Sequence, residues 1–165
     1  MDCISYKLSG KYGVDKETLI DLETYELIKG RRISVLASGY VMIWNKETEK
    51  AEYFHRWLFN LKTGDKSVVD HIDGNKLNNQ KSNLRLCTIS ENMCNRNKTV
   101  GETTSKYKGV SKHGTKWRAV CRKDKIVYEL GSFDTQEEAA EAYNTKAKEL
   151  HANYALLNIV KYEFV

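Results

Sequence analysis

The chain has 165 residues, of which 41% are hydrophobic and 30% charged, and its formal net charge is +5. This length suits one medium-sized or two small globular domains. No run of about 18 apolar residues occurs, which excludes a transmembrane helix. The N-terminus lacks the basic-then-apolar pattern of a signal peptide, so we expect a cytoplasmic protein.

The first 62 residues predict two helices and a hairpin. A helix is expected over 18–28. Residues 33–44 are rich in β-branched and aromatic types, and Ser38-Gly39 divides them into two short strands. Large apolar residues then recur at helical spacing and predict a helix over 54–62.

A second group of elements is expected over 66–97. The segment SVVDHI predicts a short strand, the Asn-rich segment 73–83 a polar loop, and NLRLCT a second strand with Leu84 and Leu86 on one face. Thr88 followed three residues later by Glu91 is a capping-box signature, so a helix should begin there. The expected unit is strand, long loop, strand, helix.

Residues 98–105 have linker composition, and the pattern changes after them. YKGVSK, KWRAVCR and IVYELGSF predict three antiparallel strands, and Thr135 with Glu138 predicts another capped helix. That helix places Ala139, Tyr143, Ala147 and Leu150 on one side. The expected fold class is therefore α+β.

The distribution of charges and cysteines along the chain limits the kinds of binding site that the protein can have. Eight Lys or Arg and one acid lie between Ser105 and Lys125, whereas three Lys and seven acids lie from Ile126 onward. Such a basic segment is typical of a phosphate-binding face, although a solvated basic loop is the alternative. The four cysteines form no CxxC pair, which argues against a zinc ribbon. Cys87 and Cys121 are interpreted as small strand residues.

The segment Val69-Asp70-His71-Ile72-Asp73-Gly74-Asn75, followed by Asn83 and Asn92, resembles the HNH endonuclease family. The resemblance is to the phage-type homing endonucleases with a DHIDGN signature, and it covers about residues 55–97. His71 to Asn83 is twelve residues and Asn83 to Asn92 is nine, as in that branch. The third motif position, often His in this class, is Asn92 here. The resemblance implies a ββα-metal core.

Phosphodiester hydrolysis needs an activated water and charge neutralisation on the phosphate. Asp70 and Asn92 are predicted metal ligands for Mg²⁺ or Mn²⁺, because a carboxylate and an amide oxygen suit a hard cation. His71 is the predicted general base. Asn83, also assigned to the catalytic set, is predicted to tie the loop so that His71 is oriented. Asp73 could compete as a ligand, with turn capping as the alternative.

Several segments of the C-terminal part resemble an AP2 domain, a DNA-binding fold whose three-stranded sheet enters the major groove. They are Tyr107-Lys108-Gly109-Val110, Trp117-Arg118-Ala119, Leu130-Gly131-Ser132-Phe133, the helix around Tyr143, and Ala155-Leu156-Leu157-Asn158. On the second strand Arg118, Val120 and Arg122 should share the outer face and Trp117 the inner one. Where the plant family presents Arg and Trp, this chain has Val127 and Glu129. Glu129 could accept from cytosine or repel phosphate.

The candidate DNA contacts lie in three places: on the outer face of this expected sheet, in the linker, and just before the HNH segment. Arg118 and Arg122 are the predicted base or phosphate contacts, with Ser111 and His113 on the same face. The predicted phosphate contacts are Lys106, Lys108, Lys112, Lys116 and Lys125. Arg96 and Lys98 are expected to follow the backbone between modules, and Arg56 is either a phosphate contact or a helix surface residue.

We therefore expect an N-terminal region with an HNH domain over 1–97, a linker over 98–105 and an AP2-like domain over 106–165. The predicted function is a site-specific DNA endonuclease of homing or mobile-element type, in the cytoplasm of a bacterial or phage-infected cell. A non-catalytic DNA-binding regulator is the alternative, and so is a nuclease of restriction or phage DNA packaging. The partner is double-stranded DNA. A monomer that nicks one strand is expected, with a dimer as the alternative.

Overall fold

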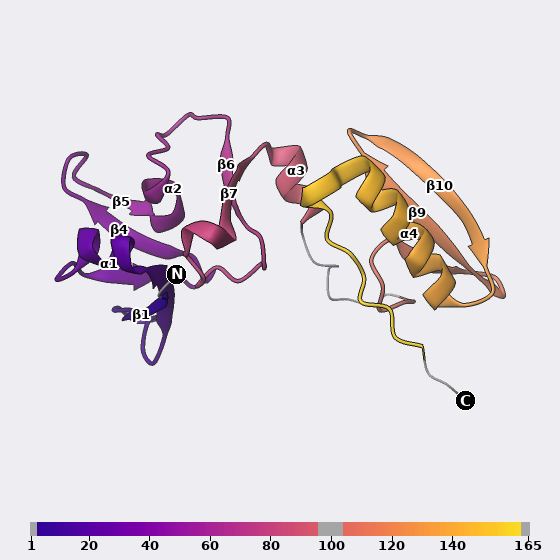
Figure 1. The fold of residues 1–165 in the computed structure, drawn as a ribbon, viewed down its shortest axis with the longest axis horizontal. Helices are drawn as coiled ribbons and strands as arrows, with labels where there is room; N and C mark the ends of the chain where they lie inside the picture. Colours follow the sequence, from indigo (N-terminus) through magenta and orange to yellow (C-terminus); the bar gives the residue numbers. More distant parts are fainter. Residues whose placement is uncertain (1–2, 96–103, 163–165) are drawn as a thin grey trace. The chain divides into compact units, whose positions relative to one another are not determined.

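The computed structural model describes residues 3–95 and 104–162. It is mixed α/β, with small antiparallel sheets and few helices in the described ranges. Two compact units divide the chain, an N-terminal unit at Met1–Ile89 and a C-terminal unit at Ser90–Val165 (Figure 1). No helix in the described ranges is long and apolar enough to cross a membrane.

The N-terminal unit begins with two small sheets. Strands β1 (Cys3–Lys7) and β2 (Glu17–Asp21) pair antiparallel, and β3 (Ile33–Val35), β4 (Val41–Asn45) and β5 (Lys50–Tyr53) form a three-stranded meander. Two short helices, α1 (Leu22–Ile28) and α2 (Phe54–Leu58), complete this part. Its buried apolar side chains are Leu8, Ile20, Ile28, Ile33, Val35, Val41, Ile43 and Phe54.

Two expected helices are shorter than predicted. The helix expected over 18–28 begins only at Leu22, because Thr18 to Asp21 pair with β1 and place Thr18 and Ile20 in the core. Alternating burial over so short a segment cannot be separated from a helical pattern by composition alone. The helix expected over 54–62 ends at Leu58, and Asn60 adopts a positive φ of 52° that stops it.

The predicted strand, loop and strand over 66–87 are present. Strands β6 (Val68–His71) and β7 (Leu84–Cys87) pair antiparallel, with His71 opposite Leu84, and a short 3₁₀ helix, η1 (Lys81–Asn83), precedes β7. Leu84 is buried but Leu86 is 46% exposed, so only one of the two leucines joins a core. Helix α3 (Ile89–Cys94) follows directly after Thr88.

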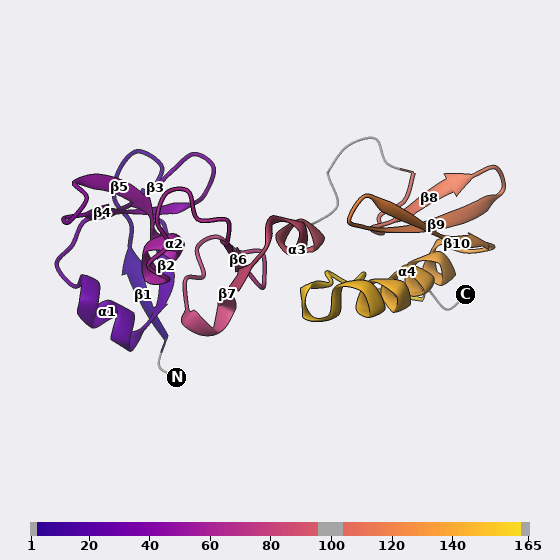
Figure 2. The same ribbon diagram turned by 90° about the horizontal axis from the view of Figure 1, so that it is seen from above.

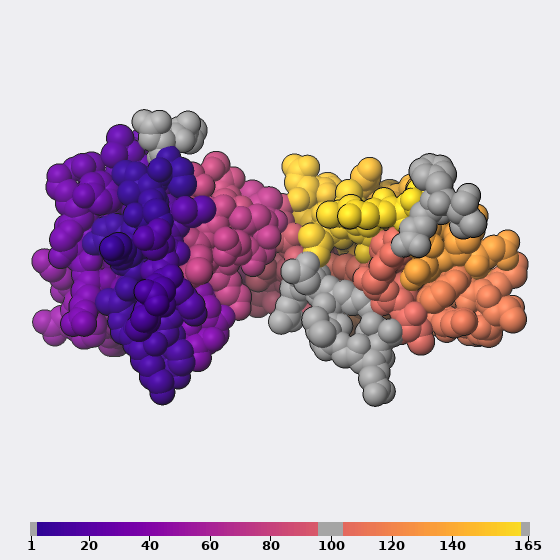
Figure 3. Space-filling model, turned by 90° about the horizontal axis from the view of Figure 1, so that it is seen from below, coloured from indigo at the N-terminus to yellow at the C-terminus, as the bar shows by residue number. Residues whose placement is uncertain are grey.

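The N-terminal strands support the loop between β6 and β7. Leu19 forms an isolated parallel bridge with Asn78, and the backbone N–H of Leu19 donates to the carbonyl of Leu77 at 2.8 Å. The N–H of Asn79 in turn donates to the carbonyl of Leu19 at 2.8 Å. In Figure 3 the indigo N-terminal residues and the magenta residues of this region form one continuous surface within the N-terminal unit.

The C-terminal unit is a three-stranded antiparallel sheet with one helix along one face (Figure 2). The strands are β8 (Val110–His113), β9 (Lys116–Lys123) and β10 (Ile126–Phe133), with β9 in the centre. Helix α4 (Gln136–His151) begins with the predicted capping box between Thr135 and Glu138, and a short η2 (Ala152–Tyr154) follows it. Its buried side is formed by Ala139, Ala140, Tyr143, Ala147 and His151.

Close contact between helix and sheet depends on Gly109, just before β8. Gly109 has φ of +74°, and a Cβ there would lie 2.1 Å from Cδ2 of Tyr143. Its carbonyl accepts from the N–H of Val120 at 2.8 Å. Val120 was expected on the exposed outer face of β9 but is only 8% exposed. Strict alternation therefore predicts more exposed residues on this strand than the structure has. Trp117 packs on the helix side as expected.

Candidate active site

The candidate site is built around His71, the last residue of β6. Adjacent strand residues point to opposite sides of a sheet. Because β6 ends at His71, the chain turns there: the N–H of Gly74 donates to the carbonyl of His71 at 2.9 Å. Asp70 and His71 are both buried, with 6% and 5% of their surface exposed. The hairpin therefore places an imidazole and a carboxylate at one protected strand end.

Asn79 is a polar neighbour of the His71 ring. Its Oδ1 lies 3.3 Å from Nε2 of His71, and its side chain is completely buried. Burial lowers the pKa of His71 below the usual histidine value. The hydrogen bond to Asn79 and the negative charges of Asp73 and Asp70 raise this pKa, but burial outweighs them. The imidazole is therefore neutral near pH 7, which is the form that accepts a proton.

Two further rings pack around His71. The ring of His55, from α2, meets it edge-on at a centroid distance of 5.1 Å, and the ring of Tyr40 lies 6.4 Å away. Burial, with smaller contributions from His71 and Arg56, lowers the pKa of His55 to about 3. The Nδ1 of His55 is buried and has no hydrogen-bond partner among the described residues. No role for His55 was predicted, and only its place beside Arg56 in the HNH resemblance could have indicated one.

Asn83 joins the two ends of the 73–83 loop through hydrogen bonds. Its Oδ1 accepts from the N–H of Asp73 at 3.1 Å, and its Nδ2 donates to Oδ1 of Asp73 and to the carbonyl of Asn78, both at 2.9 Å. The contact to the His71 side chain comes instead from Asn79, four residues earlier.

Asp73 caps the turn. Its carboxylate accepts from the N–H of Asn75 and the amide of Asn78, both at 2.8 Å, besides Asn83. Burial raises the pKa of Asp73, but these hydrogen bonds outweigh it and lower the pKa below the ordinary value. With both oxygens committed to N–H donors, turn capping explains Asp73 better than metal ligation.

Asp70 forms a buried ion pair with Arg85, its cross-strand partner on β7. Its Oδ2 accepts from Nη2 at 2.7 Å and from Nε at 2.9 Å. A carboxylate oxygen in this position suits a hard divalent cation, but such an ion has to share Asp70 with the guanidinium. No group of three or more His, Cys, Asp and Glu in the described ranges is arranged as a metal cluster. The second predicted ligand, the half-buried Asn92, lies on α3 in the C-terminal unit.

Arg56 has a local structural role. Its guanidinium donates to the carbonyl of Lys62 at 2.8 Å and to that of Ser67 at 3.4 Å, which fastens the turn before β6. This bridging competes with the predicted phosphate contact. Arg96 and Lys98 lie outside the described residues.

Some predicted DNA contacts of the C-terminal unit are exposed, whereas others already interact with acidic or aromatic side chains. Ser111, His113, Arg122 and Lys125 are exposed. Arg118 forms an ion pair with Glu129 across the sheet, and Lys116 lies 3.2 Å from Asp134. Ammonium groups of Lys106 and Lys112 lie over the rings of Tyr107 and Trp117.

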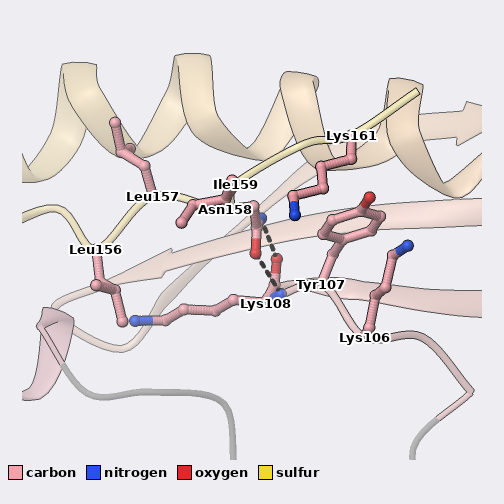
Figure 4. Close-up of a pocket in the computed structure, with 8 residues that line it drawn as sticks. All are labelled: Lys106, Tyr107, Lys108, Leu156, Leu157, Asn158, Ile159 and Lys161. Carbon is pink, nitrogen blue, oxygen red and sulfur yellow. Dashed lines mark hydrogen bonds between the residues drawn. The ribbon is translucent and has the colours of Figure 1, made fainter. Parts of the chain in front are cut away.

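Lys108 differs from the other lysines. Its Nζ donates to the carbonyl of Cys94 at 2.6 Å, and burial lowers its pKa. Its side chain lines a pocket of about 520 Å³ with Lys106, Lys161 and the segment Leu156–Ile159 (Figure 4). Asn158 fixes this segment by two hydrogen bonds to the backbone of Lys108, at 2.7 and 3.0 Å. Because its ammonium group already contacts the Cys94 carbonyl inside the unit, Lys108 contributes to packing and is a weaker candidate for a phosphate contact than the exposed lysines.

Comparison with known proteins matches these features to a family. A family model described as HNH endonuclease matches residues 52–94, which include His55, the β6–β7 hairpin and α3. The chain is 38% identical over 148 residues to an uncharacterized HNH endonuclease of Acanthamoeba polyphaga mimivirus, an alignment that covers 87% of this chain and 75% of the relative. It is 39% identical over 89 residues to Protein 3.8 of Escherichia phage T7, covering 53% and 72% of the two chains. No solved structure matches. The chain belongs to the HNH endonuclease family.

Proposed function

We propose that the chain is a site-specific, metal-dependent DNA endonuclease of homing or mobile-element type, in which His71 is the general base. The observation that carries this proposal is the buried imidazole of His71, which lies at the end of β6, contacts Asn79 and has its pKa lowered by burial. A general base must be unprotonated at the working pH and fixed in place. The environment of His71 meets both requirements.

In the proposed reaction His71 takes a proton from a water molecule as the water oxygen attacks the phosphorus. The bond to the leaving oxygen breaks, and that oxygen takes a proton from a second water molecule. Asn83 and Asp73 keep the 73–83 loop closed during this step through their mutual hydrogen bonds. The transferred proton then leaves His71 readily, because burial favours the neutral ring.

The residues proposed to hold a divalent cation, Mg²⁺ or Mn²⁺, are Asp70 and Asn92. When bound, the cation supplies positive charge to the phosphate as it becomes more negative. The Arg85 guanidinium already neutralises Asp70 at 2.7 Å, so the carboxylate is held in position before any cation arrives. Two protein ligands would suit Mg²⁺, which commonly keeps several of its own waters.

The C-terminal unit is the proposed DNA-binding module, with the outer face of its AP2-like sheet toward the groove. Exposed Arg122, Ser111 and His113 support this assignment. Arg118 is tied to Glu129, but both side chains are well exposed, at 40% and 64%. Exposed ion pairs of this kind contribute little, so Arg118 can exchange Glu129 for a phosphate or base.

A cleavage assay on supercoiled plasmid tests this function. We expect nicking in Mg²⁺, none in EDTA, and none with His71→Ala, whereas binding to duplex DNA in EDTA should survive that substitution. Asn75→Ala, which removes a turn contact in the same loop away from His71, is the matched control. Cutting by His71→Ala at the wild-type rate would contradict the proposal, and linear product without prior nicks would contradict a single-strand cut.

One observation favours a second candidate, a non-catalytic DNA-binding regulator. The Asp70 carboxylate already holds a cationic partner in Arg85, as expected if the HNH segment served only as a scaffold. A regulator would bind DNA with the same affinity in Mg²⁺ and EDTA and would leave every plasmid intact.

A further inference from the structure

Asn79 connects the candidate site to the N-terminal strands. It lies in the 73–83 loop with its side chain wholly buried, between β2 and the His71 ring. Its backbone N–H is fixed by the carbonyl of Leu19, 2.8 Å away. A buried amide with fixed partners has a defined orientation, so the direction of its donors and acceptor can be derived.

Thr18 on β2 settles which end of the amide faces His71. The Thr18 hydroxyl donates its single proton to the carbonyl of Leu77 at 2.8 Å. Toward Asn79 it can therefore only accept, and Nδ2 of Asn79 lies 2.9 Å from it. The same Nδ2 also donates to the carbonyl of Lys76 at 3.2 Å. Turning the amide over would place oxygen against that carbonyl, so Oδ1 must face His71.

The orientation of Asn79 then decides the position of the proton on His71. An amide oxygen has no proton to give, so the ring nitrogen 3.3 Å from it, Nε2, must be the donor. A neutral imidazole carries one N–H, which leaves the lone pair on Nδ1. The opposite tautomer would set two acceptors against each other in a buried site, where water cannot relieve the mismatch.

We infer that Asn79, itself fixed by Thr18, is a positioning residue that keeps His71 as the Nε2–H tautomer, so that Nδ1 is the atom that takes the proton from water. This inference rests on the proposed function for the identity of the base. The chain of hydrogen bonds runs from Leu77 through Thr18 and Asn79 to His71. The His55 ring, edge-on at 5.1 Å, opposes rotation of His71 out of this arrangement.

The tautomer can be measured on full-length, ¹⁵N-labelled protein without metal or DNA. Long-range ¹H–¹⁵N correlation spectra distinguish the two tautomers, and the His71 ring is assigned as the signal missing from His71→Ala. We expect the Nε2–H form in the wild type. Observation of the Nδ1–H form would overturn the inference without any variant having to fold.

Two variants test the cause. Asn79→Ala removes the acceptor, and Thr18→Val removes the hydroxyl that orients the amide while keeping the shape of the side chain. Both should give mixed tautomers and slow single-turnover cleavage at saturating enzyme on the order of 10- to 100-fold, with DNA affinity unchanged. Asn78→Ala, which changes the adjacent amide that contacts Asp73 instead, is the matched control and should keep the wild-type tautomer.

The outcomes separate this inference from the proposed function. Wild-type tautomer and rate in a folded Asn79→Ala would overturn the positioning role even if His71 is the base. Cleavage that survives His71→Ala would refute the general base, and the role assigned to Nδ1 with it. The Nε2–H tautomer in the wild type and its loss in Asn79→Ala would support the control of the ring by Asn79 in either case.

Discussion

Acid should destabilise the N-terminal unit through His55. Burial lowers the pKa of this histidine to about 3 in the folded protein, against about 6.5 in an unfolded chain. The unfolded state therefore binds a proton more readily than the folded state as the pH falls below 6.5. His55 leaves stability intact above that pH, and lowers it progressively between pH 6.5 and about pH 3.

The magnitude follows from the two pKa values. At pH 5 the unfolded histidine is almost fully protonated and the folded one almost fully neutral. Linkage then gives a loss of about 2 kcal/mol in the free energy of unfolding between pH 7.5 and pH 5. Replacement by Gln, which does not titrate, should remove this loss, although it also removes the ring contacts with His71 and Tyr40 at every pH.

Urea unfolding at the two pH values measures the difference. A Trp117→Phe background leaves Trp44 and Trp57, both in the N-terminal unit, as the fluorescent probes. We expect the wild type to lose about 2 kcal/mol more than His55→Gln on acidification. The exposed His113, changed to Gln, is the control and should follow the wild type. Equal losses in wild type and His55→Gln would refute the reasoning that His55 is held neutral by burial.

Three further predictions concern contacts in the two units. Asn83→Ala removes three hydrogen bonds in the loop and should lower the free energy of unfolding by about 2–3 kcal/mol in urea titrations; an unchanged midpoint would contradict this. Arg85→Leu removes the guanidinium from a buried ion pair with Asp70 and should lower the free energy of unfolding by about 3 kcal/mol, with Mg²⁺ raising the Tm more than in the wild type; a variant that is as stable as the wild type and indifferent to Mg²⁺ would refute this expectation. Glu129→Gln frees Arg118 and should tighten binding to non-specific duplex DNA and steepen its salt dependence by about one unit in fluorescence anisotropy; weaker binding would count against a phosphate-facing Arg118.

The parts of the fold that were predicted correctly have strong local signals. The three C-terminal strands follow Gly and Asp turns, and the capping box of Thr135 and Glu138 marks the start of α4. The β6–β7 hairpin was likewise predictable from two short apolar runs around an Asn-rich loop. Strands β1, β2 and β5 were missed because their pairing joins segments with no local strand signature, and β2 had been interpreted as the start of a helix.

The candidate site was predictable only where it follows the motif. His71 and Asn83 have defined places in the HNH pattern, and the structure gives both well-defined surroundings. Asn79 could not be distinguished from the neighbouring loop amides, because its partner Thr18 lies 61 residues away in the sequence. Arg85 was overlooked for a similar reason, since only the register of β6 and β7 sets it opposite Asp70.

The bridge between Leu19 and Asn78 limits how this nuclease segment can be transplanted. A hybrid enzyme that received only residues 66–97 would carry every residue of the recognisable motif, but it would lack the β2 backbone and the Thr18 hydroxyl to which the loop is fastened. The smallest portable cassette therefore has to begin upstream of β2, and protein engineers who choose its ends by motif alone would separate the histidine from its support.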